Sequence, residues 1–125
     1  MSDGDSIELF GETLSIKAVP AHTLDHIAYL VKGDTPQLFC GDTLFLAGCG
    51  RLFEGSADQM QQAMDYFASL PDSTEVYCTH EYSLANLAFA KATDPANSVI
   101  DQTITRCEQL RAENRPTLPS SIGLE

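Results

Sequence analysis

One aspartate and two histidines each follow a short run of residues that is typical of a β-strand. The apolar run at residues 37–41 is followed at once by Asp42, and similar runs precede His22 and His80. Three strand ends of this kind can meet in space, and imidazole and carboxylate groups suit zinc, iron or manganese. We therefore predict that His22, Asp42 and His80 converge on one metal site and that the function of the chain resides there.

Strand patterns come first along the chain and helical patterns follow. Short β-type runs separated by turn residues predict a four-stranded meander with strands at residues 6–10, 13–19, 26–31 and 37–41. A fifth strand is predicted at residues 75–78. There is no regular alternation of strands and helices, so the chain is predicted to be α+β, with a mostly antiparallel sheet covered on one face by helices.

Three helices are predicted in the second half of the chain. Ser56 and Gln59 have the spacing of a capping box, and apolar residues then recur at helical spacing until Pro71. Two further helices are expected at residues 84–92 and 97–113. With 125 residues and no linker or repeat, the sequence predicts a single domain spanning residues 1–125.

The strands carry apolar residues on both sides, but the helices are too few to cover both faces of a sheet. This pattern is clearest in a group of five residues, Tyr29, Leu30, Leu38, Phe39 and Cys40. We therefore expect something outside this chain to pack on the second face.

The charge of the chain excludes several classes of function. The formal net charge of -11 and pI near 4.4 argue against binding to nucleic acid or to anionic membrane surfaces, which repel an acidic protein. No apolar run approaches the roughly 20 residues that cross a bilayer, and the N-terminus is acidic where a secretory signal would be basic. We expect a cytoplasmic protein with reduced thiols, because the four cysteines are widely spaced and form no C-x-x-C pair.

Residues 47–55 hold three glycines and one cation, Arg51, which is the only positive charge between Lys32 and Lys91. Such a segment predicts a shaped loop near the site. An anionic substrate would need a local positive charge on this acidic chain, and Arg51 can supply it.

Four segments together resemble the glyoxalase II enzymes, or hydroxyacylglutathione hydrolases, of the metallo-β-lactamase fold. The matching segments are residues 20–26, 39–45, 48–55 and 79–86. The resemblance implies an αββα sandwich, of which this chain would be one βα half. It also implies a hydrolase that converts S-lactoylglutathione to glutathione and D-lactate with hydroxide generated at two metal ions. The cofactor would be zinc, with iron or manganese as alternatives.

The resemblance also implies a role for each matching residue. His22 would be a terminal ligand of one metal, His80 a terminal ligand of the other, and Asp42 the catalytic carboxylate that bridges the two. Three further positions match residues that hold glutathione in the family, namely Arg51, Tyr82 and Asn86.

Neighbouring polar residues are expected to play other roles. His26 begins the next strand, so we predict that it makes hydrogen bonds beside the site and does not bind the metal. Glu81 is adjacent to His80, and adjacent residues on an extended segment point in opposite directions, so it is predicted to face away from the ion. Cys49 and Cys78 are expected to be ordinary core or loop thiols.

The chain departs from the family pattern in one major way. The signature His-x-His-x-Asp-His is absent, and only three histidines are present. We therefore expect residues 1–125 to form a partial domain that lacks the N-terminal half and the basic C-terminal tail of the family. On this view the chain alone binds metal weakly or not at all and is inactive.

Two alternatives remain open at the level of the sequence. A persulfide dioxygenase of the same fold would use a single iron held by two histidines and one aspartate. A non-enzymatic half-domain would instead form a homodimer, or pair with the missing N-terminal half, through its uncovered sheet face.

Overall fold

The first four strands form the predicted antiparallel meander, and two later strands extend the same sheet. The structure is a computed structural model that describes residues 1–125. The sheet has the order β1-β2-β3-β4-β7-β8, in which β7 runs parallel to β4 and the other neighbours are antiparallel. Its strands are β1 Ser6–Leu9, β2 Glu12–Ala18, β3 Ile27–Val31, β4 Gln37–Gly41, β7 Glu75–Cys78 and β8 Ser120–Ser121.

The remaining elements are two short strands and three helices. The strands β5 (Leu44–Phe45) and β6 (Gly48–Cys49) form a separate pair. The helices are α1 (Ala57–Ala68), α2 (Ser83–Thr93) and α3 (Ser98–Ala112). All three helices occur where the sequence predicts them, whereas β5, β6 and β8 contain only two residues each and give no periodic signal. None of the three helices is long and apolar enough to span a lipid bilayer.

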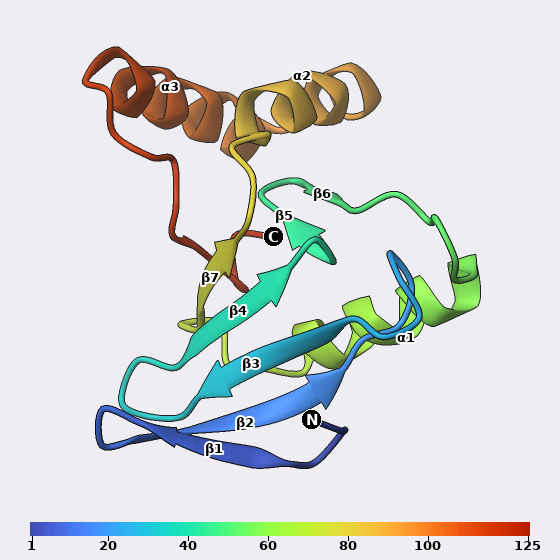
Figure 1. Cartoon of the computed structure of the whole chain (residues 1–125). Coiled ribbons are helices and arrows are strands. Elements are labelled where there is room, and N and C mark those ends of the chain that lie inside the picture. The colour runs from blue at the N-terminus through green and yellow to red at the C-terminus, as the bar shows by residue number, and fades with distance from the viewer.

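Helix α1 covers one face of the sheet (Figure 1). Ser56 caps its N-terminus with the predicted capping box, since the Ser56 hydroxyl accepts from the Gln59 N–H and the Gln59 side chain accepts from the Ser56 N–H. Phe67 of α1 is buried in the core with the neighbouring strand residues Leu30, Leu38 and Val76. This core holds α1 against the central strands.

Helices α2 and α3 pack elsewhere. They lie together beyond one end of β4 and β7 (Figure 1), and form a second small core around Leu46, Leu87 and Cys107. The expectation of a sheet covered by helices therefore holds for α1. The α2–α3 pair instead covers the segment around β5 and β6, because its apolar side chains pack into one cluster with Leu46 and Ala47 of that segment.

The face of the sheet opposite α1 carries apolar side chains without a helix over them. We call this the open face and define it by Leu14, Tyr29, Val31, Phe39 and Tyr77, which the strand register places on the same side. The Phe39 and Tyr77 rings stack with centroids 5.1 Å apart, and Phe39 is 38% exposed. The prediction of apolar residues on both sides of the strands is confirmed, because Leu30, Leu38 and Cys40 lie in the core with α1 and Tyr29 and Phe39 lie on the open face.

Candidate metal centre

The structure brings the three predicted ligand residues together at one end of the sheet. His22 Nε2 lies 3.7 Å from Asp42 Oδ2, and His80 Nε2 lies 3.1 Å from Asp42 Oδ1. They come from the segment after β2, the turn after β4 and the turn after β7. The sequence predicted this convergence from the three strand ends and from the family resemblance of the segments around them.

Asp42 reaches this position because Gly41 turns the chain sharply after β4. Gly41 has a φ of +57°, and a Cβ atom there would lie 2.4 Å from His26 Nε2. A residue other than glycine would therefore meet both backbone strain and a clash. The register of β4 against β7 also shifts between Phe39 and Gly41, which bends the strand where the carboxylate is delivered.

Two histidine rings are hydrogen-bonded to backbone groups, and these bonds determine which ring nitrogens are free to bind a metal. His22 Nδ1 lies 2.8 Å from the Arg51 carbonyl oxygen and donates to it, so in the neutral ring it is Nε2, the nitrogen facing Asp42, that carries no proton. His26 Nε2 accepts from the Asp42 N–H at 3.1 Å, so this nitrogen is already used. His26 therefore supports the Asp42 backbone, as predicted from the sequence, and does not share the ligand position of His22.

Thr79 is a site residue that the sequence reasoning missed. Its hydroxyl donates to Asp42 Oδ1, and its oxygen also lies 3.3 Å from the Gly41 carbonyl oxygen. The Thr79 N–H donates to the same carbonyl at 3.4 Å. Thr79 thus fixes the carboxylate from the β7 side. Its position directly before His80 is the only sequence signal that could have identified it.

The three side chains form two imidazole–carboxylate pairs and do not enclose one point as a set of three ligands for a single ion. Each Asp42 oxygen faces a different imidazole. This division suits a carboxylate shared between two ions, each with one histidine from this chain, better than it suits one closed site. Imidazole nitrogens and carboxylate oxygens are ordinary ligands of zinc and of iron, so the donor set fits such a pair of ions.

The two cysteines near the site are thiols in ordinary surroundings. Burial raises the pKa of Cys78, and its Sγ donates to the His80 carbonyl oxygen at 3.4 Å. Cys49 is exposed. Cys78 is thus a half-buried thiol at the end of β7 and Cys49 a thiol of the loop that lines the cleft.

All six predicted site residues line one cleft of about 540 Å³. Besides the metal-ligand candidates, it is lined by Arg51, Tyr82 and Asn86, and by Phe45, Cys49, Gly50 and Phe53. Gly50 lets its loop approach the site, because a Cβ there would lie 1.9 Å from the Asp42 carbonyl oxygen. The predicted shaped loop therefore forms one wall of the cleft.

The three predicted substrate-binding residues differ in how they are held. The Tyr82 ring stacks on His80 with centroids 5.0 Å apart and meets Phe45 edge-on at 5.2 Å. The Asn86 Nδ2 donates to the Leu46 carbonyl oxygen at 3.1 Å, so this side chain also braces the wall of the cleft. Arg51 takes part in none of the ion pairs of the protein, which leaves its charge available to a ligand.

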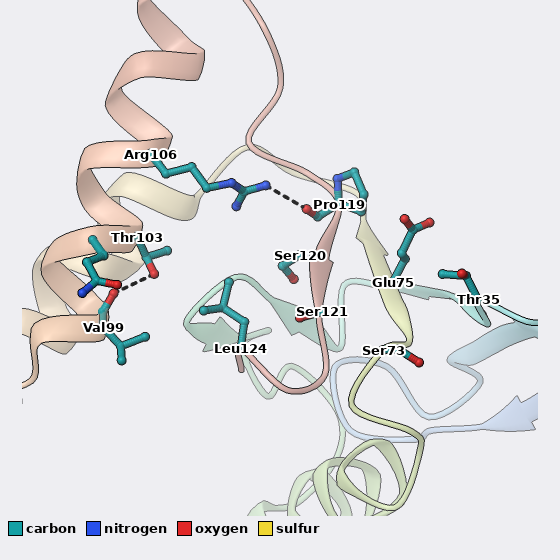
Figure 2. A pocket seen from close by; sticks show the side chains of 11 residues that line it. Thr35, Ser73, Glu75, Val99, Thr103, Arg106, Pro119, Ser120, Ser121 and Leu124 are labelled. Carbon is teal, nitrogen blue, oxygen red and sulfur yellow. Dashed lines mark hydrogen bonds between the residues drawn. The ribbon is translucent and has the colours of Figure 1, made fainter.

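A second hollow, of about 650 Å³, lies between α3 and the β7–β8 edge and contains none of the predicted residues. Figure 2 shows Arg106 reaching across it to the Pro119 carbonyl oxygen, a hydrogen bond of 3.3 Å. Its walls are mostly hydroxyl-bearing or charged side chains from α3, β7 and β8. The metal-ligand candidates lie only in the first cleft.

Comparison with known families divides the chain into two matched parts. The family described as "Metallo-beta-lactamase superfamily" matches residues 1–80, and the family described as "Hydroxyacylglutathione hydrolase C-terminus" matches residues 81–125. The chain is 55% identical over 126 residues to a hydroxyacylglutathione hydrolase of Pseudomonas putida (strain GB-1). That match covers 100% of this chain and 49% of the relative, so the chain spans about half the length of the relatives it matches.

Two solved structures have a similar fold. ETHE1 from Myxococcus xanthus has a TM-score of 0.60 and 35% identity, over 66% of this chain and 36% of that one. TTHA1623 in a di-iron-bound form has a TM-score of 0.54 and 28% identity, over 64% of this chain and 39% of that one. These matches confirm the predicted α+β fold class and the resemblance that the sequence motifs indicated.

Proposed function

Because the chain belongs to the metallo-beta-lactamase superfamily, we propose that it supplies half of the dinuclear site of a hydroxyacylglutathione hydrolase. The observation that carries this proposal is the convergence of all six motif residues on one cleft. The names of the relatives support glutathione thioesters, such as S-lactoylglutathione, as the substrate class. The names of these relatives give no support to the persulfide dioxygenase alternative.

Zinc is the proposed metal, with two ions in a complete site. When bound, such a pair lowers the pKa of water to about 7 and polarises a thioester carbonyl. The di-iron form of one structural neighbour keeps iron as an alternative. Metal binding by this chain alone is proposed to be weak, because it offers one histidine for each ion and a shared carboxylate.

The residues of this chain have separate roles in the proposed reaction. Asp42 would supply a carboxylate ligand to the metal ions; its carboxylate is held by the Thr79 hydroxyl and its backbone N–H by the His26 ring. Arg51 attracts the carboxylates of glutathione on an otherwise acidic protein. Tyr82 and Asn86 lie along the cleft wall, where they can orient the peptide of the substrate. The glutathione thiolate is a good leaving group, so no strong general acid is required.

The other half of the site is proposed to come from a second layer of protein on the open face. The face carries apolar side chains from β2, β3, β4 and β7, and the relatives contain a further half of their length that this chain does not match. Sheets pack face to face at about 10 Å through such side chains. In the absence of that layer, a second copy of this chain can cover the face and form a homodimer.

The four free thiols support a reducing compartment, so cytoplasm remains the proposed location.

The test is a thioesterase assay that combines this chain with the unmatched half of the Pseudomonas putida relative, in the presence of zinc. We expect hydrolysis of S-lactoylglutathione only when both polypeptides are present, and a loss of at least 100-fold in the Asp42→Asn variant. The matched control is Asp34→Asn in the exposed β3–β4 turn, which should keep full activity. Equal activity of the Asp42→Asn variant would refute the proposed site. Turnover by this chain alone at ordinary enzyme rates would refute its incompleteness.

A further inference from the structure

Residues 79–82 present both His80 and Tyr82 to the cleft, yet they belong to neither a strand nor a helix. They lie between the end of β7 at Cys78 and the start of α2 at Ser83. The N-cap residue of α2 is Tyr82, and it makes no capping hydrogen bond through its side chain. The direction of the two rings therefore has to be set by other contacts of this segment.

The carboxylate of Glu81 makes two such contacts, both with Thr117, which does not line the cleft. One of its oxygens, Oε2, accepts from the Thr117 N–H at 3.1 Å, and the other, Oε1, accepts from the Thr117 hydroxyl. Thr117 is fully buried, and its hydroxyl is also 2.6 Å from that of Ser83. Hydrogen bonds to an ionised carboxylate are roughly twice as strong as those between neutral groups.

Thr117 belongs to a segment that is itself fixed, which we call the C-terminal strap and define as residues 117–121. Arg106 of α3 donates to the Pro119 carbonyl oxygen (Figure 2), and β8 pairs with β7 through Ser120 opposite Val76. The strap is thus held by α3 and by the sheet. Glu81 is bound to a rigid part of the fold.

From these contacts we propose that Glu81 is a positioning residue for His80 and Tyr82. Its side chain is held toward Thr117 while that of His80 points to Asp42, so the two neighbours extend in opposite directions from one backbone turn. Fixing Glu81 on the strap therefore fixes His80 over Asp42 and Tyr82 over His80, whose rings stack at an angle of 24°. Arg111 lies 3.9 Å from Glu81 Oε2 and adds a cation on the same side.

The inference rests on the proposed function only where it takes the oriented His80 to be a metal ligand. The positioning itself can be measured without metal. In the metal-free chain, the His80–Tyr82 ring contact at 5.0 Å should give a nuclear Overhauser effect between ring protons. The His22–Phe53 contact, also at 5.0 Å, lies on the other wall of the cleft and is an internal reference.

The experiment compares the wild-type chain with Glu81→Ala, Thr117→Val and the control Glu108→Ala, an exposed acid on α3 with no side-chain partner. We expect Glu81→Ala to lose the His80–Tyr82 signal and to keep the His22–Phe53 signal. Thr117→Val should weaken the first signal while preserving a β-branched side chain in the buried position. Glu108→Ala should leave both signals unchanged. Retention of the His80–Tyr82 signal in Glu81→Ala, or loss of both signals, would overturn the proposal.

Zinc affinity, measured by competition with a chromogenic chelator, separates this inference from the proposed function. If the wild-type chain binds zinc, Glu81→Ala should bind it about 10-fold more weakly, which is typical of residues that orient a ligand. Unchanged zinc affinity in that variant would count against the positioning role. If the wild-type chain alone binds no zinc, which the proposed incomplete site allows, the two ring contacts decide the role of Glu81, and the thioesterase assay with both polypeptides tests the proposed function separately.

Discussion

At the scale of single residues, the site depends on side chains whose surroundings give them one conformation. Gly41 places Asp42 by adopting a left-handed backbone, His26 accepts the Asp42 N–H, and Thr79 holds the carboxylate. The sequence identified Asp42 because an acid directly after an apolar strand is conspicuous. Thr79 gave no such signal, because a threonine at a strand end is common. Its hydroxyl lies within hydrogen-bonding distance of Asp42 only because β4 pairs with β7.

The four free cysteines give a test at this scale. Burial raises the pKa of Cys40 to about 12, and Cys40 and Cys107 are fully buried, whereas Cys49 is exposed beside the cleft. Because the thiolate is the reactive form, we expect a thiol reagent at pH 8 to modify Cys49 first and to leave Cys40 and Cys107 unmodified in the folded protein. Mass spectrometry of peptides after timed labelling checks the order. Early modification of Cys40 would contradict the burial described for β4.

At the scale of elements, α1 and the strands β1 to β4 and β7 were predictable, and the placement of α2 and α3 was not. Periodicity and the capping box at Ser56 define α1 locally. The pattern of α2 and α3 shows that they are helices, but not which apolar surface they meet. That choice depends on Leu46 and Ala47 near β5 and β6, two strands too short to have a pattern of their own.

Helix α1 provides a stability test. Phe67 is 2% exposed and packs into the main core, so Phe67→Ala should reduce the free energy of unfolding by about 3–5 kcal/mol. The matched control is Phe89→Ala on α2, where the ring is 74% exposed and the expected change is below about 0.5 kcal/mol. Urea unfolding followed by circular dichroism measures both values. Similar losses for the two variants would refute the packing of α1 on the sheet.

At the scale of the whole molecule, the proposed second layer accounts both for the open face and for the proposed incompleteness of the site. A sheet with apolar side chains on both faces needs protein on both, and α1 covers only one. The cleft lies at the end of this sheet, so a layer packed on the open face would also bring its own side chains near Asp42.

The open face predicts self-association when this chain is alone. We expect a dimer at tens of micromolar that is converted to a monomer by Phe39→Asp, because Phe39 lies on the open face and is partly exposed. Phe89→Asp, which changes an exposed ring on α2, should leave the dimer intact. Sedimentation equilibrium measures the masses. A monomeric wild-type chain throughout the micromolar range would contradict self-pairing.

The sequence by itself determined the meander and the three helices, because strand periodicity and caps are local properties, and its resemblance to the hydroxyacylglutathione hydrolases indicated six of the residues that line the cleft. The tertiary structure alone decided how the C-terminal strap runs. Its β8 pairs with β7, its Thr117 binds Glu81, and its Pro119 accepts from Arg106. These contacts join residues 13 to 46 positions apart, and such pairings follow from the packing of the whole chain. No local pattern encodes them.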